Sequence, residues 1–421
     1  MVDADQTFVI VGGGLAGAKA AETLRAEGFT GRVILICDER DHPYERPPLS
    51  KGYLLGKEER DSVFVHEPAW YARNDIELHL GETVDAIDRT AKTVRFGEDG
   101  TVVRYDKLLL ATGAEPRRLD IPGTDLAGVH HLRRLAHAER LKGVLAALGR
   151  DNGHLVIAGA GWIGLEVAAA AREYGAEVTV VEPLATPLHS VLGPELGNVF
   201  AELHREHGVR FHFGARLTEI VGQDGMVLAA RTDDGEEHPA HDVLAAVGAA
   251  PRIALAEAAG LEIADRSHGG GVVVDERLRT SDPDIHAAGD VASFHHALFD
   301  TRLRVEHWAN ALNGGPAAAR AMLGRQVTYD RVPYFFSDQY DLGMEYSGWA
   351  PPGTYDEVVI RGDAGKREFI AFWLKDRRVL AGMNVNVWDV TDPIQQLIST
   401  KTQVNTESLA DPHVPLESLV P

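Results

Sequence analysis

Two glycine-rich loops carry the residue spacing that binds the pyrophosphate of a dinucleotide. The first loop places Gly12, Gly14 and Gly17 between an apolar run and an alanine-rich stretch that predicts a helix. In this pattern the first glycine allows a tight turn, the second lets the backbone approach the pyrophosphate, and the third lets helix and strand pack closely. The amides at the helix N-terminus then face the phosphates. The spacing alone does not say which dinucleotide is bound.

An acidic residue follows each loop at the place where a pair of ribose hydroxyls would bind. Asp38 follows the strand after the first loop, and Glu182 ends the strand after the second loop, which holds Gly159, Gly161 and Gly164. A carboxylate there binds the free ribose hydroxyls of NADH and would repel the extra phosphate of NADPH. The segment PLATPLHSVL that follows Glu182 has no lysine or arginine to receive that phosphate. This pattern favours NADH at the second loop.

Small residues end two further predicted strands, where a backbone could cross close to a bound cofactor. One strand lies in YDKLLLATGAEPR and ends at Ala111, Thr112 and Gly113, shortly before Arg117. The other lies in TSDPDIHAAGD and ends at the pair Gly289-Asp290. An acid at such a strand end could bind a polyol chain such as the ribitol of FAD, and the alternative is a helix N-cap. Two nucleotide sites in one chain imply two nucleotides that exchange electrons.

Cysteine content and charge exclude several classes of function. Cys37 is the only cysteine, so neither an internal disulfide nor a redox-active cysteine pair can form. The chain has 42 lysines and arginines against 63 acidic residues, a net charge of -21. This balance argues against nucleic acid or an anionic membrane as a general partner. No metal site is predicted. Because no apolar stretch is long enough to span a membrane and the N-terminus lacks a basic signal segment, we expect a cytoplasmic protein without membrane insertion.

The elements that must position these residues alternate between buried strands and helices. Short apolar runs at 7–11, 33–36, 108–111, 155–158 and 178–181 predict parallel strands, and alanine-rich stretches predict the helices between them. Each glycine loop lies in a strand, loop, helix, strand pattern, so one nucleotide-binding architecture occurs twice.

The texture of the sequence changes near Arg325, where aromatic residues cluster and alternating strand-like segments follow. We therefore predict an α/β protein with two Rossmann-like dinucleotide-binding domains and a smaller α+β domain at the C-terminus. The predicted bounds are 1–120 with 248–325 for the first, discontinuous domain, 121–247 for the second and 326–421 for the third.

The chain resembles the two-dinucleotide-binding flavoprotein reductases, and most closely the putidaredoxin reductase-like, NADH-dependent ferredoxin reductases of oxygenase systems. Besides the first loop, the resemblance rests on RPPLSKGYL, ATG, GAGWIGLE, AAGD and FFSDQY, in this order along nearly all of the 421 residues. It implies a glutathione reductase-like fold, with FAD bound non-covalently at the first loop and NADH at the second.

The resemblance also implies roles for individual residues. Arg46 and Lys51 would lie against the FAD, and Lys51, near the flavin ring, would pair with Glu166 and take part in catalysis. A buried lysine needs such an anionic partner, and a solvated lysine without one is the alternative. The remaining residues implied for FAD are Gly12, Gly14, Gly17, Asp38, Ala111, Thr112, Gly113, Arg117, Gly289, Asp290 and Trp308, and those for NADH are Gly159, Gly161, Trp162, Gly164, Glu166 and Glu182.

Two aromatic residues are open to alternative interpretations. Trp162 lies where the family often places an aromatic that covers the nicotinamide pocket, although a large aromatic at a domain seam is as often simple packing. Phe336 departs from relatives that carry tryptophan, which puts a stacking or electron-transfer role for this residue in doubt.

The activity implied is transfer of hydride from NADH to flavin, followed by single-electron transfer to an iron-sulfur ferredoxin that serves a cytochrome monooxygenase or another oxygenase. Docking of an acidic ferredoxin would need a local basic surface. Arg302 and Arg304 are the first candidates and Arg377 and Arg378 the second, with solvated surface arginines as the alternative. A monomer and a homodimer are both open.

The same residues bear on other classes of function. The single cysteine excludes disulfide reductases of the glutathione reductase type. Near Lys51, lysine and serine stand where a peroxidase with one redox cysteine would carry that cysteine, which disfavours this class. A redox-sensing interaction protein like apoptosis-inducing factor shares the RPPLSK segment and the lysine-glutamate pair. Reduction of rubredoxin or monodehydroascorbate would use the same flavin half-reaction. These last alternatives stay open.

Overall fold

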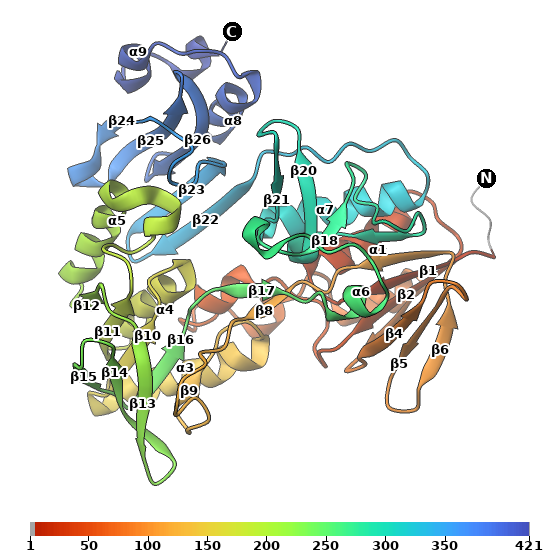
Figure 1. Ribbon diagram of the computed structural model, residues 1–421, viewed down its shortest axis with the longest axis horizontal. Coiled ribbons are helices and arrows are strands. Elements are labelled where there is room, and N and C mark those ends of the chain that lie inside the picture. Colours follow the sequence, from red (N-terminus) through yellow and green to blue (C-terminus); the bar gives the residue numbers. More distant parts are fainter. Residues whose placement is uncertain (1–4, 421) are drawn as a thin grey trace. The chain divides into compact units, whose positions relative to one another are not determined.

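The computed structural model describes residues 5–420, which form two compact units built from separate stretches of chain (Figure 1). The first unit holds the chain up to Arg46, Glu59–Glu115 and Ala249–Pro333. The second holds Pro47–Glu58, Pro116–Gly248 and the chain from Tyr334 onward. The three domains of the sequence analysis are a finer division, and their bounds stay a prediction.

The first unit is built on a five-stranded parallel sheet in the order β19-β7-β1-β2-β3. The central strands β1 and β2 are apolar and buried, as strands covered on both faces must be. β1 runs directly into the first glycine loop, and α1 begins at the end of that loop. The bounds are β1 Thr7–Val11, α1 Leu15–Ala26, β2 Arg32–Cys37, α2 Pro68–Arg73, β3 Ile76–Leu80, β7 Lys107–Leu110, β19 Ile285–Ala287 and α7 Trp308–Met322.

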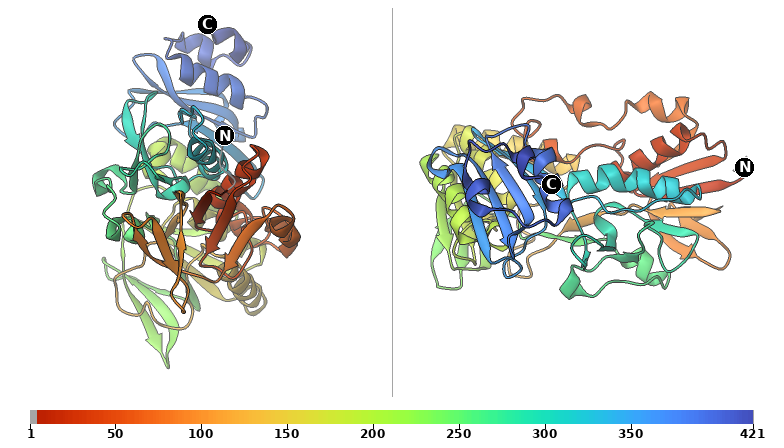
Figure 2. Two further views of the ribbon diagram at one scale, coloured as in Figure 1. Left: turned by 90° about the vertical axis from the view of Figure 1, so that its right-hand side faces the viewer. Right: turned by 90° about the horizontal axis from the view of Figure 1, so that it is seen from above.

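Helix α7 lies beside α1 (Figure 2). The two backbones approach closely at Gly315, where a Cβ would lie 2.2 Å from the carbonyl oxygen of Ala16. Only a residue without a side chain allows this approach. The packing fixes α1, and with it the helix N-terminus that follows the first loop.

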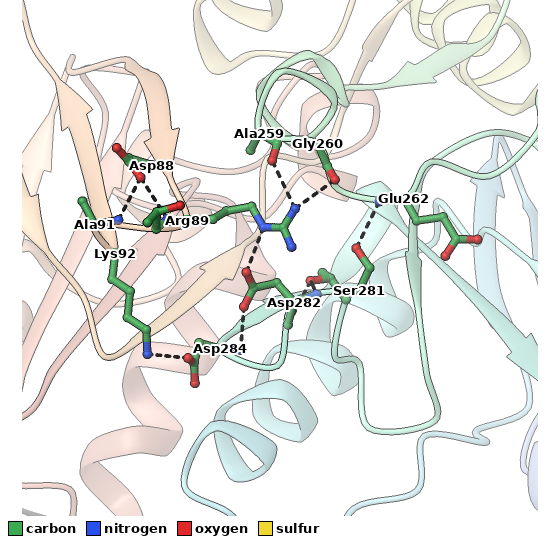
Figure 3. A network of polar contacts seen from close by, with 12 residues as sticks. Asp88, Arg89, Ala91, Lys92, Ala259, Gly260, Glu262, Ser281, Asp282 and Asp284 are labelled. Atoms are coloured by element: carbon green, nitrogen blue, oxygen red, sulfur yellow. Dashed lines mark hydrogen bonds and ion pairs between the residues drawn. The ribbon is translucent and has the colours of Figure 1, made fainter.

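Two three-stranded sheets also belong to the first unit, the antiparallel sheet β4-β5-β6 and the mixed sheet β18-β20-β21, and ion pairs connect the first of them to the segment that leads into β19. Arg89 Nε lies 2.8 Å from Asp282 Oδ2, and Lys92 Nζ lies 2.5 Å from Asp284 Oδ2 (Figure 3). Lys107 on β7 also contacts Asp284, at 2.7 Å. These contacts hold β19, the strand that leads to Gly289. The bounds are β4 Val84–Asp88, β5 Thr93–Phe96, β6 Thr101–Arg104, β17 Ala249–Pro251, α6 Ala254–Ala258, β18 Val272–Val274, β20 Ala292–His296 and β21 Thr301–Leu303.

The second unit repeats the parallel architecture in a sheet of order β12-β11-β10-β16-β9. β10 runs into the second glycine loop and α4 follows it, as β1 and α1 do in the first unit. The bounds are β8 Ala114–Pro116, which joins the two units in sequence, β9 Val129–His130, α3 Leu135–Asp151, β10 His154–Ala158, α4 Trp162–Glu173, β11 Glu177–Glu182, α5 His189–Glu206, β12 Arg210–Phe213, β13 Leu217–Gln223, β14 Met226–Thr232, β15 Glu237–Pro239 and β16 Asp242–Ala245.

The chain from Tyr334 forms a five-stranded antiparallel sheet, in the order β22-β23-β26-β25-β24. Its apolar side chains, such as Phe369 and Trp373, share one hydrophobic core with Leu155 and Leu165 of the parallel sheet and α4. The C-terminal sheet is therefore packed into the second unit. The bounds are β22 Tyr334–Gln339, β23 Leu342–Gly348, β24 Glu357–Asp363, β25 Glu368–Lys375, β26 Arg378–Val385, α8 Thr391–Thr400 and α9 Thr406–Ala410.

The predicted fold class is confirmed: two parallel-sheet, Rossmann-like regions are followed by a smaller region with an antiparallel sheet and helices. Each of the five apolar runs predicted as a strand lies within or next to an observed strand. Among residues 5–420, every helix is too short or too polar to cross a membrane.

Candidate functional site

The first glycine loop forms an open cradle in front of α1. Gly12 has a φ of +118°, and a Cβ there would lie 2.1 Å from the carbonyl oxygen of Ala111. A Cβ at Gly17 would lie 2.0 Å from the carbonyl oxygen of Gly12, so the helix start packs against the strand end. At Gly14 a Cβ would meet no atom within 4 Å. The space in front of the helix N-terminus can therefore receive a phosphate.

The segment Ala111 to Gly113 lies against this cradle and is connected to the predicted ribose acid. Thr112 Oγ1 donates to the carbonyl oxygen of Arg252 at 2.9 Å, and the amide of Arg252 donates to Gly113. Arg252 Nη1 in turn lies 3.0 Å from Asp38 Oδ2. Sequence reasoning missed Arg252, because no local signal relates it to a residue more than 200 positions earlier. The structure brings Asp38 together with the ATG turn through this arginine.

Arg46 lies at the centre of an acidic group in the first unit. Its Nη2 is 3.1 Å from Glu39 Oε1, and its Nη1 is 3.1 Å from the hydroxyl of Tyr44. Burial opposes the charge, but Tyr44, Glu39 and Asp290 together raise the pKa of the Arg46 guanidinium above its usual value. Arg46 and Asp290 therefore interact electrostatically, although they come from distant parts of the sequence. A permanent positive charge is placed where an anionic cofactor is predicted.

Gly289, Asp290 and Trp308 also lie in the first unit. Gly289 has a φ of +76°, and a Cβ there would lie 3.2 Å from Ala16 on α1. Asp290 follows directly and is 8% exposed. Trp308 begins α7 and donates from Nε1 to Glu45 Oε2 at 2.7 Å. The predicted FAD residues of three separate chain stretches thus belong to one unit, whereas Lys51 and Arg117 belong to the other.

The predicted docking arginines differ in their exposure. The side chain of Arg304 is only 8% exposed, and its guanidinium contacts Glu306 and the carbonyl oxygens of Gly269 and Asp290. This placement corrects the expectation of an exposed docking residue, because Arg304 instead holds the backbone at Asp290. Arg302 is half-buried and donates to the carbonyl oxygen of Ser293 at 2.8 Å. The second pair, Arg377 and Arg378, is exposed.

The second glycine loop has the same construction as the first. Gly159 has a φ of +101°, and a Cβ there would lie 2.5 Å from the carbonyl oxygen of Ala246. A Cβ at Gly164 would lie 2.1 Å from the carbonyl oxygen of Gly159, whereas one at Gly161 would meet no atom within 4 Å. The open position thus falls at the second glycine of each loop. Both cradles fit a dinucleotide pyrophosphate.

Glu182 is held by backbone amides at the edge of the second cradle. Its Oε2 accepts from the amide of Ala160 at 2.8 Å, and its Oε1 accepts from the amide of Leu184 at 3.0 Å. The amide of Ala160 belongs to the glycine loop itself. These bonds fix the carboxylate beside the loop, where it can accept hydrogen bonds from a ribose and would repel a phosphate.

Glu166 lies on α4, is 3% exposed, and gathers three donors. Lys51 Nζ donates to its Oε1 at 2.7 Å, the hydroxyl of Ser337 donates to the same oxygen at 2.7 Å, and the hydroxyl of Ser50 donates to Oε2. The structure thus pairs Lys51 with Glu166 as the resemblance implied. A buried carboxylate needs hydrogen-bond donors and a positive charge of this kind at its oxygens.

Ser337 extends this network into the interior, and sequence reasoning missed it. Gln339 Nε2 donates to Ser337 Oγ at 3.1 Å, and Gln339 Oε1 lies 2.8 Å from Nε2 of the buried His204. The signal was present in FFSDQY, because alternation along β22 buries Phe335, Ser337 and Gln339 on one face. Phe336 points to the other face, where its ring centroid lies 5.4 Å from Lys51 Nζ.

Trp162 packs against aromatic residues of the second unit. Its ring lies 5.1 Å from that of Phe335 and 5.7 Å from that of Phe200, both in edge-on geometry. This contact supports a packing role, and a role in covering nicotinamide stays a prediction.

Cys37, the only cysteine, is buried. Burial raises the pKa of its thiol, and the nearby charges of Asp38 and Glu39 raise it further. It therefore lacks the reactive thiolate that disulfide chemistry requires.

Residues 6–315 match the family model described as pyridine nucleotide-disulphide oxidoreductase, and residues 334–420 match the model described as reductase C-terminal. The chain belongs to the pyridine nucleotide-disulphide oxidoreductase family. The second match covers the antiparallel sheet and the helices α8 and α9. This family membership accounts for the repeated cradle, although the chain has only one cysteine.

Relatives within the family are similar over their whole lengths. A probable ferredoxin reductase, CtmF, of Castellaniella defragrans is 38% identical over 419 residues, which cover 99% of this chain and 100% of that protein. Putidaredoxin reductase CamA of Pseudomonas putida is 36% identical over 421 residues, 100% of this chain and 98% of that protein. The resemblance to putidaredoxin reductase-like proteins is confirmed.

A solved structure supports the same family relationship. The reductase in a covalent complex of putidaredoxin reductase with putidaredoxin has a TM-score of 0.93 and 36% identity, and the match covers 99% of this chain and 98% of that chain. A ferredoxin reductase from Rhodopseudomonas palustris has a TM-score of 0.92 and 35% identity, covering 99% of this chain and 100% of that one.

Proposed function

We propose that the chain is an NADH-dependent flavoprotein reductase that binds FAD non-covalently in the first unit and passes electrons to an iron-sulfur ferredoxin of an oxygenase system. The observation that carries the proposal is the doubled cradle. Both loops are open at the second glycine and closed at the third, so the chain is built to hold two dinucleotides. Electron exchange between two such cofactors is what this arrangement permits.

The assignment of each cofactor rests on the residues around each loop. Arg46 and Asp290 interact in the first unit, where Asp38 is held by Arg252, and these residues offer acceptors and a positive charge for an extended ligand. The second loop has Glu182 at its edge, and its carboxylate suits free ribose hydroxyls. We assign FAD to the first loop and NADH to the second. Bound flavin would accept hydride and release single electrons, which is the chemistry that a ferredoxin requires.

We propose that Lys51 and Glu166 are the residues that tune this reaction. The Glu166 carboxylate accepts hydrogen bonds on both of its oxygens, and Lys51 donates to one of them, so the Lys51 ammonium has a fixed position. Replacement of Lys51 by methionine should leave FAD bound but slow flavin reduction by NADH by about tenfold, a modest electrostatic effect. Stopped-flow absorbance would measure this rate, and recovery with Lys51→Arg would show that the charge matters. Unchanged rates in Lys51→Met would reject the role.

The acceptor is proposed from the relatives whose names state one. Anthranilate 1,2-dioxygenase ferredoxin-NAD(+) reductase of Burkholderia cepacia is 37% identical over 414 residues. A second acceptor is favoured by a rubredoxin-NAD(+) reductase of Pseudomonas putida, which is 35% identical over 382 residues. Steady-state NADH oxidation with two-iron ferredoxins, rubredoxin and ferricyanide would distinguish them. Activity with ferricyanide alone would reject both acceptors.

The same assay addresses another alternative, a redox-sensing interaction protein. Such a protein would turn over slowly with every acceptor and would form a long-lived complex with NADH. Fast reduction of a ferredoxin would reject it. The cytoplasmic location goes beyond the lack of a membrane-spanning helix among residues 5–420 and remains a proposal.

A further inference from the structure

Two histidines and a glutamate meet in the second unit, on elements that neither glycine loop uses. His212 lies on β12, His238 lies on β15, and Glu236 ends the turn that leads into β15. One possible ligand atom from each of these residues lies within 4.8 Å of the others. Two imidazoles and one carboxylate are a ligand set that borderline divalent cations such as Zn²⁺ use in proteins.

The turn around Glu236 fixes the tautomer of His212. Asp234 Oδ1 accepts from the hydroxyl of Thr232 at 2.6 Å and from the amide of Glu236 at 3.2 Å, so this carboxylate is held in place. Its other oxygen, Oδ2, lies 2.8 Å from Nε2 of His212. A carboxylate oxygen accepts hydrogen bonds, so Nε2 of His212 is the donor in this contact and carries a proton.

This tautomer leaves Nδ1 of His212 facing a second carboxylate. Glu236 Oε2 lies 3.2 Å from Nδ1. In a neutral imidazole that donates from Nε2, Nδ1 is an acceptor, and two acceptors at this distance repel each other. Either a second proton or a metal cation must lie between them. In a tetrahedral zinc site with bonds of about 2.0–2.2 Å, neighbouring ligand atoms lie about 3.3 Å apart, close to the spacing here.

His238 supplies an independent sign of a ligand. It is 8% exposed, and within the described chain its Nε2 is buried without a hydrogen-bond partner. An orphaned buried nitrogen is costly and calls for an explanation. Its ring centroid lies 4.9 Å from that of His212.

We propose that His212, Glu236 and His238 form a binding site for one Zn²⁺-class divalent cation, with Asp234 orienting His212 from behind. A carboxylate on the far nitrogen of a metal-bound histidine is the usual second partner in such sites. The bound cation would connect β12 to the turn before β15. Because His212 and Val181 are register partners on β12 and β11, it would also stiffen the strand that ends at Glu182.

The proposal is tested on tag-free holoenzyme that has been treated with EDTA and dialysed. We expect isothermal titration with ZnCl₂ to show one site per chain, and the site should be lost in both His212→Ala and His238→Ala. His413→Ala removes an exposed histidine of the same unit and should bind as the parent does. Asp234→Asn should weaken binding by about 10- to 100-fold, as loss of a second partner does at other metal sites. Flavin absorbance would show that each variant is folded.

Electron paramagnetic resonance with Cu²⁺ provides a second measurement on the same variants. Two imidazole nitrogens should couple to the copper in the parent chain and one in His238→Gln. Stoichiometric binding that persists in both histidine variants would overturn the proposal, and so would an absence of binding in the parent.

Discussion

The two glycine loops share one construction but differ in how their acids are held. Asp38, which follows the first loop, lies 3.0 Å from the guanidinium of Arg252, so its charge is partly neutralised by the protein. Glu182, which follows the second loop, is held by two backbone amides and keeps its full negative charge toward a ligand. The same fold thus presents an acid paired with an arginine at one site and an acid that would repel a phosphate at the other.

The helices after the two loops also differ in how their charged side chains are held. Lys19 on α1 and Glu166 on α4 each lie two residues after the third glycine of their loops. Lys19 pairs with Glu22 on its own helix, and its side chain is 25% exposed. Glu166 is buried and pairs with Lys51 from another segment. The first helix therefore only supports its cradle, whereas the second also carries an interior polar network.

Alanine at the first glycine of either loop should have the largest effect. Gly12→Ala forces a Cβ against Ala111 at a positive φ, and we expect a colourless protein that has lost its FAD. Gly159→Ala meets Ala246 in the same way, so we expect a yellow protein whose reduction by NADH is slowed by about a hundredfold. Flavin content and stopped-flow reduction measure the two effects. Gly143→Ala, in open space on α3, is the matched control, and FAD loss in the Gly159 variant alone would reverse the assignment.

Removal of the Glu166 charge should have the next largest effect. Glu166→Gln leaves the mostly buried Lys51 ammonium without its counter-charge, and we expect the free energy of unfolding to fall by about 3 kcal/mol. Chemical denaturation monitored by circular dichroism would measure the loss. The control is Lys57→Met, which breaks an exposed pair with Glu173 and should cost less than about 1 kcal/mol. Equal losses in the two variants would contradict the distinction between buried and exposed pairs.

Acidification should destabilise both units through buried histidines. Burial lowers the pKa of His204 in the second unit and of His307 in the first to about 4. Because the unfolded value is about 6.5, the neutral histidines contribute stability above that pH and lose it as the pH falls toward 4. Each could account for about 2 kcal/mol at pH 5. We expect His204→Gln to flatten the dependence of the unfolding free energy on pH between 6.5 and 4, and the exposed His413→Gln to leave it unchanged.

The acid at the second loop should set the choice of nicotinamide cofactor. Glu182→Ala removes a charge that would repel the extra phosphate of NADPH, so the preference for NADH should fall by about tenfold, equivalent to about 1.4 kcal/mol. The ratio of kcat/KM for the two cofactors measures this change. Asp38→Ala is the control from the first loop and should leave the ratio unchanged while weakening FAD binding. If the ratio of kcat/KM values changes in the Asp38 variant instead, the FAD and NADH assignments of the two loops must be exchanged.

Much of the site was accessible from the sequence because its signals are local. Each glycine loop lies within a few residues of its strand and helix, and Asp38 and Glu182 follow at the ends of the next strands. Lys51 and Glu166 required the family resemblance, since 115 positions separate them. Arg252 carried no pattern at all. Arg304 lies on a strand-like segment whose alternation does not reveal that its guanidinium turns inward to the backbone at Asp290.

Ser337 and Gln339 are a different case, because their burial follows from the two-residue repeat of β22. What the repeat could not show is the partner, since Glu166 comes from a helix elsewhere in the chain. The metal-ligand set was missed for the same reason. His212 and His238 lie on separate strands and come together only through the turn that fixes Asp234.

An anaerobic titration tests the central claim most directly, because it follows both cofactors and the acceptor in one cuvette. We predict that the purified protein is yellow, that one equivalent of NADH bleaches it far faster than NADPH does, and that two equivalents of an oxidised two-iron ferredoxin restore the colour. A protein that cannot be loaded with FAD, or one whose NADH-reduced flavin is left unchanged by ferredoxins and rubredoxin alike, would contradict the account.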